Sequence, residues 1–339
     1  MRELQDVIRG IRQGLARQEV MVLATVVRVE GSAYRHPGAR LLLGVEGPRL
    51  GCVSGGCLEG DIQARAAEVL ATGRAKLLRY DLTGDLDLVW GTGSGCEGVA
   101  EVLLEPLVPG PGLAWLDAVE EAFRTRRTVR LGTAFAAAED SGWAVGAHRI
   151  LADGESLPAG CEGLVERLDP PVALWILGAG EDARPLVDFA RIMGWIVGIA
   201  DHRPALARSE RFPDADAVLL GRPGATIPRM SLDARSAVLL LSHLWDRDKE
   251  ALPLLLQSPA AYVGLLGHRR RGAKLLEALA EEGFVPTLGQ QERLYSPVGL
   301  DLGGQEPGEI ALAVVAEVKA VLGGRRGGHL RDRQAPLHG

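Results

Sequence analysis

Apolar residues recur with two different periods along the chain, and each period predicts a different kind of element. Over residues 2–18 they return every three or four positions, which is typical of an amphipathic helix. Residues 20–29 are rich in β-branched side chains and predict a strand. By the same criteria we predict strands at 39–45, 49–54, 75–80 and 99–104, a helix at 59–70, and a helix with two short strands within 113–148. The sequence therefore predicts a mixed α/β domain over residues 1–155.

Two stretches in this half of the chain lack a regular period. Residues 81–98 are rich in glycine and aspartate, and long irregular segments inside a domain tend to be functional or mobile. Residues 156–171 end in Pro170-Pro171, a pair that cannot continue a helix. We interpret residues 156–171 as a linker or a short ordered bridge.

From Val172 onward the pattern changes to alternating strands and helices. We predict strands at 172–177, 195–200, 217–220, 237–241 and 262–266, with helices at 180–193, 247–257, 269–282 and 307–322. Such alternation indicates a parallel sheet with right-handed crossovers. We therefore predict a Rossmann-like domain over residues 172–322. Residues 323–339 carry four arginines and no apolar pattern, and we expect a flexible tail there.

Composition narrows the class of protein. The 339 residues suggest about two domains, and 47% hydrophobic residues suffice for folded cores. The net charge of −6 disfavours a general nucleic-acid or membrane-surface binder. No apolar run approaches the ~20 residues of a membrane span, and the first residues lack the apolar core of a secretory signal. Four cysteines make no disulfide framework, so we expect a cytoplasmic protein with reduced thiols.

The segment ILGAGEDA, residues 176–183, follows a predicted strand and matches a dinucleotide-binding turn. Gly178 allows the tight turn, Gly180 lets a phosphate approach the backbone, and Asp201 lies where a ribose-binding carboxylate is expected. However, the carboxylates of Glu181 and Asp182 would repel a pyrophosphate. Two interpretations stay open: a nucleotide site, or a turn that only packs a helix on the sheet.

Further candidate ligands follow the later strands, whose carboxyl ends line the ligand crevice of open α/β sheets. His243 and Asp248 lie in LLLSHLWDRD after the fourth strand. Arg269 lies in GLLGHRRR after the fifth, and an arginine there could grip a phosphate. The alternatives are a histidine that caps loop backbone and an arginine run on a solvated helix face.

Two glycine-rich cysteine segments carry the candidate chemistry of the first domain. In GCVSGGCLE, Gly55 and Gly56 precede Cys57, which falls at a predicted helix start where the helix dipole favours a thiolate. Cys96 lies in the second segment, GTGSGCEG. A thiolate could bind a soft metal or pass sulfur, whereas the spacing does not suit zinc. The alternative for Cys57 is a small buried apolar residue. Arg40, in GSAYRHPGAR, adds a possible anion ligand or belongs only to a loop.

Taken together, these segments resemble the XdhC/CoxI family, accessory proteins of xanthine dehydrogenase and related molybdenum hydroxylases. The resemblance covers roughly residues 20–110 and 172–322. It rests on GSAYRHPGARLLL, GCVSGGCLEG, VLLEP, ILGAG, ADHRP, RFPDAD, LSHLWDRD, YVGLLGHRRR and SPVGLDLGGQEPGEIALAVVAEV.

The resemblance implies a maturation factor rather than a catalyst. Such proteins bind the molybdenum cofactor (molybdopterin), protect it while a cysteine desulfurase installs its terminal sulfur, and deliver it to the apo-hydroxylase. Cys57 and Cys96 match the family's cysteines and would lie near molybdenum or its sulfur, while His243 and Asp248 match its strand-end residues. Where the family has Gly-Ser-Arg, this chain has Gly267-His268-Arg269. We also expect a homodimer, because the first helix is amphipathic.

Two other function classes stay open. The Rossmann-like half alone suggests an NAD(P)-dependent oxidoreductase, with His243 as acid–base group and Asp201 on the ribose. A scaffold that only bridges a desulfurase and the apo-hydroxylase would bind no small ligand at all.

Overall fold

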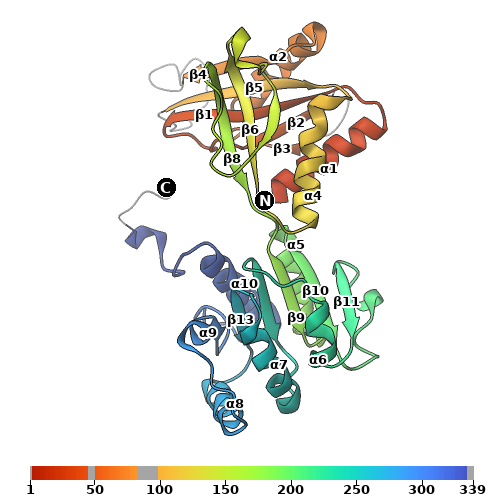
Figure 1. Cartoon of the computed structure of the whole chain (residues 1–339), viewed down its shortest axis with the longest axis vertical. Helices are drawn as coiled ribbons and strands as arrows, with labels where there is room; N and C mark the ends of the chain where they lie inside the picture. The colour runs from red at the N-terminus through yellow and green to blue at the C-terminus, as the bar shows by residue number, and fades with distance from the viewer. Residues whose placement is uncertain (1, 45–49, 82–97, 334–339) are drawn as a thin grey trace. The chain divides into compact units, whose positions relative to one another are not determined.

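The computed structural model describes residues 2–44, 50–81 and 98–333 (Figure 1). The chain divides into two compact units, the first ending at Pro170 and the second beginning at Pro171. Over the residues described, no helix combines the length and apolar character needed to cross a membrane. The second cysteine segment, with Cys96, and most of the irregular segment 81–98 lie outside the described residues.

The first unit is built on a five-stranded antiparallel sheet in the order β3-β2-β1-β5-β4. Its strands are β1 (Met21–Gly31), β2 (Arg40–Gly44), β3 (Leu50–Gly51), β4 (Lys76–Asp81) and β5 (Gly98–Leu107). The central pair β1 and β5 runs from Met21 opposite Leu107 at one end to Gly31 opposite Gly98 at the other. Of the predicted strand 49–54, the described residues form a strand only at Leu50–Gly51, where a Cβ on Gly51 would lie 2.1 Å from the Arg40 carbonyl oxygen.

Both faces of this sheet are covered by helices. Among the described residues, the helices of this unit are α1 (Arg2–Ala16), α2 (Glu59–Thr72) and α4 (Ala114–Arg124). Alternation along β1 places Leu23 in a core with α1 and α4, and Val22 in a core with α2. Figure 1 shows α1 and α4 side by side on the face opposite α2. The period-based predictions of α1, β1 and α2 are thereby confirmed.

A smaller three-stranded sheet completes the first unit, in the order β7-β6-β8. Its strands are β6 (Val129–Ala137), β7 (His148–Leu151) and β8 (Cys161–Leu168). Strand β8 pairs with β6 over nearly its whole length, so the prediction of a linker over 156–171 is wrong for this stretch. Most β8 side chains are only partly buried, so backbone pairing with β6, rather than an apolar pattern, holds this strand in place.

The second unit is a six-stranded sheet in which all neighbouring strands are parallel, in the order β11-β10-β9-β12-β13-β14. The strands are β9 (Ala173–Leu177), β10 (Ile196–Asp201), β11 (Ala217–Leu220), β12 (Ser236–Leu240), β13 (Tyr262–Leu265) and β14 (Leu294–Tyr295). Numbered from β9, the order is 3-2-1-4-5-6, that of Rossmann folds. The predicted fold class, a mixed α/β domain plus a Rossmann-like domain, is confirmed.

Helices cover both faces of the parallel sheet. They are α5 (Ala183–Ile192), α6 (Pro223–Thr226), α7 (Trp245–Gln257), α8 (Arg269–Glu281), α9 (Leu288–Glu292) and α10 (Pro307–Leu322). One core packs α5 and α10 against the sheet, and the other packs α7 and α8 against the opposite face. The reversal of strand order between β9 and β12 opens the carboxyl edge of the sheet, where the predicted glycine turn lies.

Candidate functional site

The segment 52–58, which joins β3 to α2 and is called here the Cys57 loop, is held by two buried polar groups. The Glu59 carboxylate accepts hydrogen bonds from the backbone N–H of Ser54 (3.0 Å) and Val53 (3.3 Å), and from the Ser54 hydroxyl. The Ser54 Oγ in turn accepts from the N–H groups of Gly56 and Leu58, both at 3.1 Å. The backbone around Cys57 is therefore fixed before any ligand arrives.

Glu59 is only 8% exposed, and its environment keeps it ionised. Burial opposes the charge, but the hydrogen bonds from the Ser54 side chain and from backbone N–H groups outweigh burial and lower the pKa of Glu59. Glu59 also opens α2, where a negative charge suits the helix dipole.

Cys57 is a free, partly exposed cysteine two residues before the start of α2. Gly56 has a φ of +113°, a conformation that favours glycine, and apart from its two chain neighbours no heavy atom of the described residues lies within 4 Å of the position of a Cβ there. A Cβ at Gly55 would be 3.6 Å from the Tyr34 ring. The loop thus combines a hydrogen-bonded backbone with a partly buried cysteine that packs against the core beneath α2.

Cys52 and Cys161 do not have the lowered thiol pKa of a reactive cysteine. Burial raises the pKa of Cys52, against the opposing effect of Arg35, and burial likewise raises the pKa of Cys161. Both are therefore held in the thiol form. Among residues 2–44, 50–81 and 98–333, no group of three or more His, Cys, Asp or Glu side chains could hold a metal ion.

Arg40 is buried and already paired. Its guanidinium forms an ion pair with Glu166 of β8 and donates to the Gly38 carbonyl oxygen at 2.8 Å. The structure thus places Arg40 between β2 and β8 as a link between two sheets, rather than at an open anion site.

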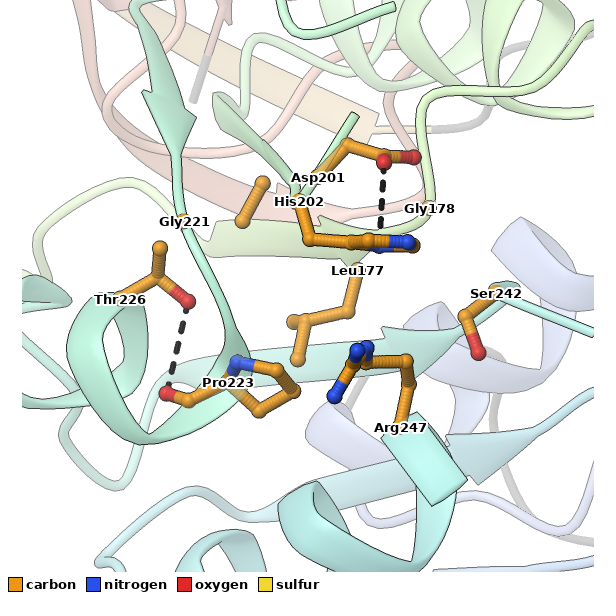
Figure 2. Close-up of a pocket in the computed structure, with 10 residues that line it drawn as sticks. Leu177, Gly178, Asp201, His202, Gly221, Pro223, Thr226, Ser242 and Arg247 are labelled. Atoms are coloured by element: carbon orange, nitrogen blue, oxygen red, sulfur yellow. Dashed lines mark hydrogen bonds and ion pairs between the residues drawn. The ribbon is translucent and has the colours of Figure 1, made fainter. Parts of the chain in front are cut away.

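At the carboxyl edge of the parallel sheet, the strand ends surround a narrow pocket (Figure 2). Gly178, Asp201, Gly221 and Arg247 are among the residues that line it. The cavity is about 20 Å³, which is room for little more than one water molecule. The Arg247 Nε is buried and has no hydrogen-bond partner among the described residues.

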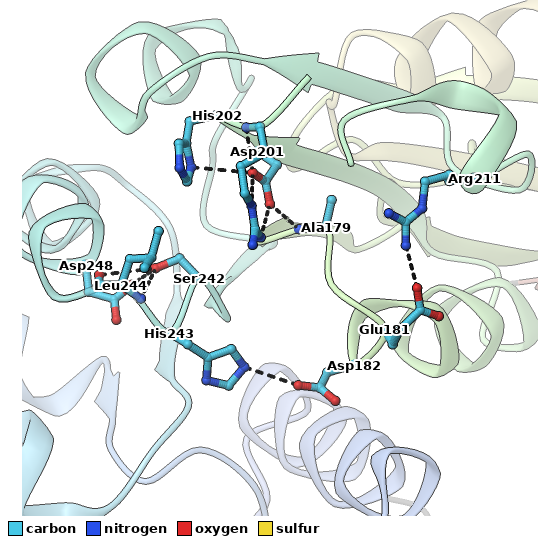
Figure 3. A network of polar contacts seen from close by, with 11 residues as sticks. Ala179, Glu181, Asp182, Asp201, His202, Arg211, Ser242, His243, Leu244 and Asp248 are labelled. Atoms are coloured by element: carbon cyan, nitrogen blue, oxygen red, sulfur yellow. Dashed lines mark hydrogen bonds and ion pairs between the residues drawn. The ribbon is translucent and has the colours of Figure 1, made fainter. Parts of the chain in front are cut away.

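The predicted glycine turn is present, but an internal carboxylate already binds it (Figure 3). A Cβ at Gly178 would lie 2.5 Å from the Leu241 carbonyl oxygen, so this position requires glycine. The Ala179 N–H donates to Asp201 Oδ2 at 2.7 Å. Arg203 donates to Asp201 Oδ1 from its backbone N–H and from Nε, and to Oδ2 from its guanidinium.

Asp201 is therefore occupied rather than open to a ribose. Its side chain is 1% exposed. Burial alone would disfavour the charge, but the Arg203 side chain and the backbone N–H groups reverse the balance and lower the pKa of Asp201. The carboxylate that the sequence suggested for ribose binding instead joins the glycine turn to the end of β10 through the hydrogen bond from Ala179.

The acidic residues after the turn contact neighbouring basic side chains, as Figure 3 shows. Asp182 Oδ2 lies 3.2 Å from His243 Nε2, and Glu181 Oε1 lies 2.5 Å from an Arg211 guanidinium nitrogen. His243 is exposed and adopts a φ of +57°, which is uncommon outside glycine. The structure thus brings His243 and the glycine turn together, as expected for two features at one sheet edge.

Asp248 is almost fully buried at the start of α7. Its Oδ1 accepts from the Ser242 hydroxyl at 2.6 Å, and its Oδ2 pairs with Arg271. Arg269, the candidate from the arginine run, is exposed at the start of α8. Asp248 therefore fixes the loop that carries His243, and the inward-facing arginine is Arg271.

Sequence reasoning missed three residues that matter in these two regions: Glu59 in the Cys57 loop, and Arg271 and Arg247 in the second unit. Glu59 had a visible signal, because an acidic residue directly after SGGCL suits a helix start. The inward turn of Arg271 and the approach of Arg247 to the pocket depend on how α7 and α8 pack, and no local pattern carries that information.

Comparisons with known proteins match both halves of the chain. Residues 15–81 match the XdhC and CoxI family, and residues 174–318 match the XdhC Rossmann domain. A protein of Bacillus subtilis (strain 168), named as a probable xanthine dehydrogenase subunit, is 31% identical over 322 residues, covering 90% of this chain and 94% of that protein.

Two further similarities span nearly the whole chain. The "Molybdenum cofactor insertion chaperone PaoD" of Escherichia coli (strain K12) is 24% identical, covering 94% of this chain and 88% of that protein. A crystal structure described as a xanthine dehydrogenase from Bacillus halodurans is 30% identical with a TM-score of 0.79, covering 94% of this chain and 96% of that one. With both halves matched and a relative 31% identical over most of both lengths, the chain belongs to the XdhC and CoxI family.

Proposed function

We propose that this chain binds the molybdenum cofactor and delivers it to a molybdenum hydroxylase of the xanthine dehydrogenase type. The names of two relatives, a molybdenum cofactor insertion chaperone and a probable xanthine dehydrogenase subunit, support this role. Within the chain itself, the observation that carries the proposal is the Cys57 loop. Buried groups fix its backbone, while the Cys57 residue itself is only partly buried.

The donor set of the Cys57 loop fits this cargo. A thiolate is a soft ligand, suited to molybdenum or to its terminal sulfur. Open space at Gly56 allows a bulky group to approach, and the fixed loop needs no reordering on binding. Cys96, outside the described residues, is the second proposed sulfur contact.

The proposal also includes partner proteins, a cellular location and further residues that contact the cofactor. We infer that the chain holds the cofactor while a cysteine desulfurase installs its terminal sulfur, and that it acts in the cytoplasm as a homodimer. Cofactor contacts beyond the thiols are proposed at Gly55, Gly56, Gly178, Gly180, His243 and Arg269. Arg40, Asp201 and Asp248 are positioning residues in this proposal, because each is buried in an internal ion pair.

Co-purification tests the proposal. The full chain is co-expressed with the cofactor pathway, and molybdenum and oxidised-pterin fluorescence are measured per mole of protein. Cys57→Ser should lower both by about tenfold or more, whereas the matched control Cys161→Ser should leave them unchanged. Absence of pterin from the unaltered protein, or equal retention in the Cys57→Ala, Cys96→Ala double variant, would contradict the proposal.

The alternative of an NAD(P)-dependent oxidoreductase has less support from the geometry. Both oxygens of Asp201 are used internally, and the adjacent cavity is about 20 Å³. Titration of NAD(P)H against the full chain separates the two functions. We expect no saturable binding at micromolar concentrations, and micromolar binding would favour the oxidoreductase.

A further inference from the structure

The loop that joins β1 to β2, residues 32–39 and called here the Tyr34 loop, carries an aromatic side chain at the surface of the first unit. Tyr34 is 66% exposed. Among the phenylalanine, tryptophan and tyrosine residues in the described part of the chain, it alone is exposed, and the others are buried or partly buried. Single exposed apolar side chains are common, so what distinguishes Tyr34 is where its ring lies.

The Tyr34 ring lies with one face toward Gly55 of the Cys57 loop. A Cβ built on Gly55 would lie 3.6 Å from Tyr34 Cδ2 and 3.7 Å from both Cγ and Cε2. This Cβ would therefore point at the face of the ring, because an approach from the ring edge cannot be equally near to three consecutive ring atoms. One face of Tyr34 thus covers the Cys57 loop, and the exposed area of the ring is on its other side.

One carboxylate holds both loops. The Arg35 guanidinium forms an ion pair with Glu3 of α1, in which one nitrogen lies 2.5 Å from Glu3 Oε1. The same Glu3 oxygen accepts a hydrogen bond at 3.4 Å from the backbone N–H of Cys52, the first residue of the Cys57 loop. Because Arg35 is the direct neighbour of Tyr34, this link holds the ring beside the Cys57 loop before any ligand binds, so that little ordering is needed on binding.

We propose that the outer face of Tyr34 stacks on the pterin ring system of the molybdenum cofactor, and that Tyr34 thereby adds a binding contact for a flat heterocycle next to Cys57. An aromatic side chain offers a flat ring both apolar contact area and a face for stacking. Stacking of this kind tolerates different heterocycles, because it uses their faces rather than their hydrogen-bonding edges. The inference rests on the proposed function, since it assigns a further contact to the same cargo at the same loop.

The spacing between the Tyr34 ring and Cys57 suits a ligand with a flat ring at one end and sulfur and metal at the other. The ring lies over Gly55, which is two residues from Cys57, so the two Cα atoms are at most about 7 Å apart. A role of Tyr34 in core packing is the alternative, and its exposure argues against that role. For the same reason Tyr34→Ala should leave the urea unfolding midpoint nearly unchanged, so that any lost binding reports on the ring itself.

Fluorescence titration of the full chain, purified without the cofactor pathway, tests the contact. The probe is unsubstituted pterin, which lacks molybdenum, dithiolene and phosphate, and whose own fluorescence reports binding. We expect a Kd of about 1 mM or tighter for the unaltered chain, and about tenfold weaker binding for Tyr34→Ala. Tyr34→Phe, which keeps the ring, should restore the affinity to within about twofold. The control Val20→Ala, an exposed position before the opposite end of β1, should bind as the unaltered chain does.

Two results of this titration would overturn the proposal. They are equal pterin affinity in Tyr34→Ala and the unaltered chain, and no pterin binding up to about 10 mM.

Cofactor retention separates a failure of this inference from a failure of the proposed function. In protein co-expressed with the cofactor pathway, Tyr34→Ala should lower the pterin content per mole of protein about fivefold, and Tyr34→Phe should restore it. If the unaltered chain retains cofactor and Tyr34→Ala retains as much, the stacking contact is wrong and the proposed function stands. If the unaltered chain retains none, the proposed function is wrong, and the titration with free pterin decides the stacking contact by itself.

Discussion

The Cys57 loop and the glycine turn at residues 178–182 are built alike, but they differ in which of their polar groups are already paired within the protein. Each is a glycine-containing turn that leads into a helix, and each is fixed by a buried carboxylate with a lowered pKa. In the Cys57 loop, Glu59 binds the backbone from within, and the Cys57 residue is only partly buried. In the glycine turn, Asp201 takes a turn N–H, and Asp182 pairs with His243.

The difference indicates which of the two turns offers a side chain for binding the cofactor. A buried carboxylate that accepts backbone N–H groups makes a turn rigid in both units. Of the two turns, only the Cys57 loop carries a sulfur side chain. We therefore assign the principal cofactor contact to the Cys57 loop and a positioning role to the Asp201 network.

The largest expected effect is that of Glu59→Ala. It removes the acceptor for two backbone N–H groups and one hydroxyl, and should lower the free energy of unfolding by about 3 kcal/mol. Glu68→Ala, at an exposed position of the same helix, should lower the free energy of unfolding far less. Urea unfolding of both variants measures the difference. Equal losses would mean that Glu59 does not hold the loop.

A smaller effect should appear in the pH dependence of stability. Because the pKa of Asp201 is lowered on folding, its contribution is complete above the unfolded-state pKa of about 4 and is lost as the pH falls through the folded-state pKa. Asp201→Asn should therefore be less stable than the unaltered chain near pH 7, with the difference shrinking as the pH falls below about 4. Urea midpoints across this range, with exposed Glu210→Gln as control, provide the measurement. A difference independent of pH would contradict the lowered pKa.

The smallest effect is expected for Asp182→Asn. Its pair with His243 is exposed, so stability should change by less than about 0.5 kcal/mol. If the glycine turn were the main anion site, removing this charge would strengthen the binding of inorganic phosphate. We expect a change of less than about twofold by calorimetry, and a several-fold gain would reverse the assignment of roles between the two turns.

The sequence predicts those helices and strands in which apolar residues recur with a regular period. The alternation along β1, the amphipathic face of α1 and the strand–helix alternation after Val172 all have one apolar face toward a core. Strand β8 is not predicted because its side chains are mostly half-exposed, and β14 is not predicted because two residues carry no period.

The candidate site is predictable in residue type but not in pairing. Asp201 lies at the expected spacing, yet its hydrogen bond from the Ala179 N–H forms only when β9 and β10 come together. The same holds for Asp248 with Arg271, which lie 23 positions apart on different helices. Whether a polar side chain is open or already paired is a tertiary property, which local sequence patterns do not carry.

The central claim, that the cofactor is bound at the Cys57 loop, is tested most directly by thiol labelling of the full chain with and without its cargo. Iodoacetamide modification of each cysteine is followed by mass spectrometry, with Cys161 as internal reference. We expect the cofactor-loaded protein to label at Cys57 about tenfold more slowly than the empty protein, and at Cys161 at the same rate. Equal rates at Cys57 in the loaded and empty protein would contradict the claim.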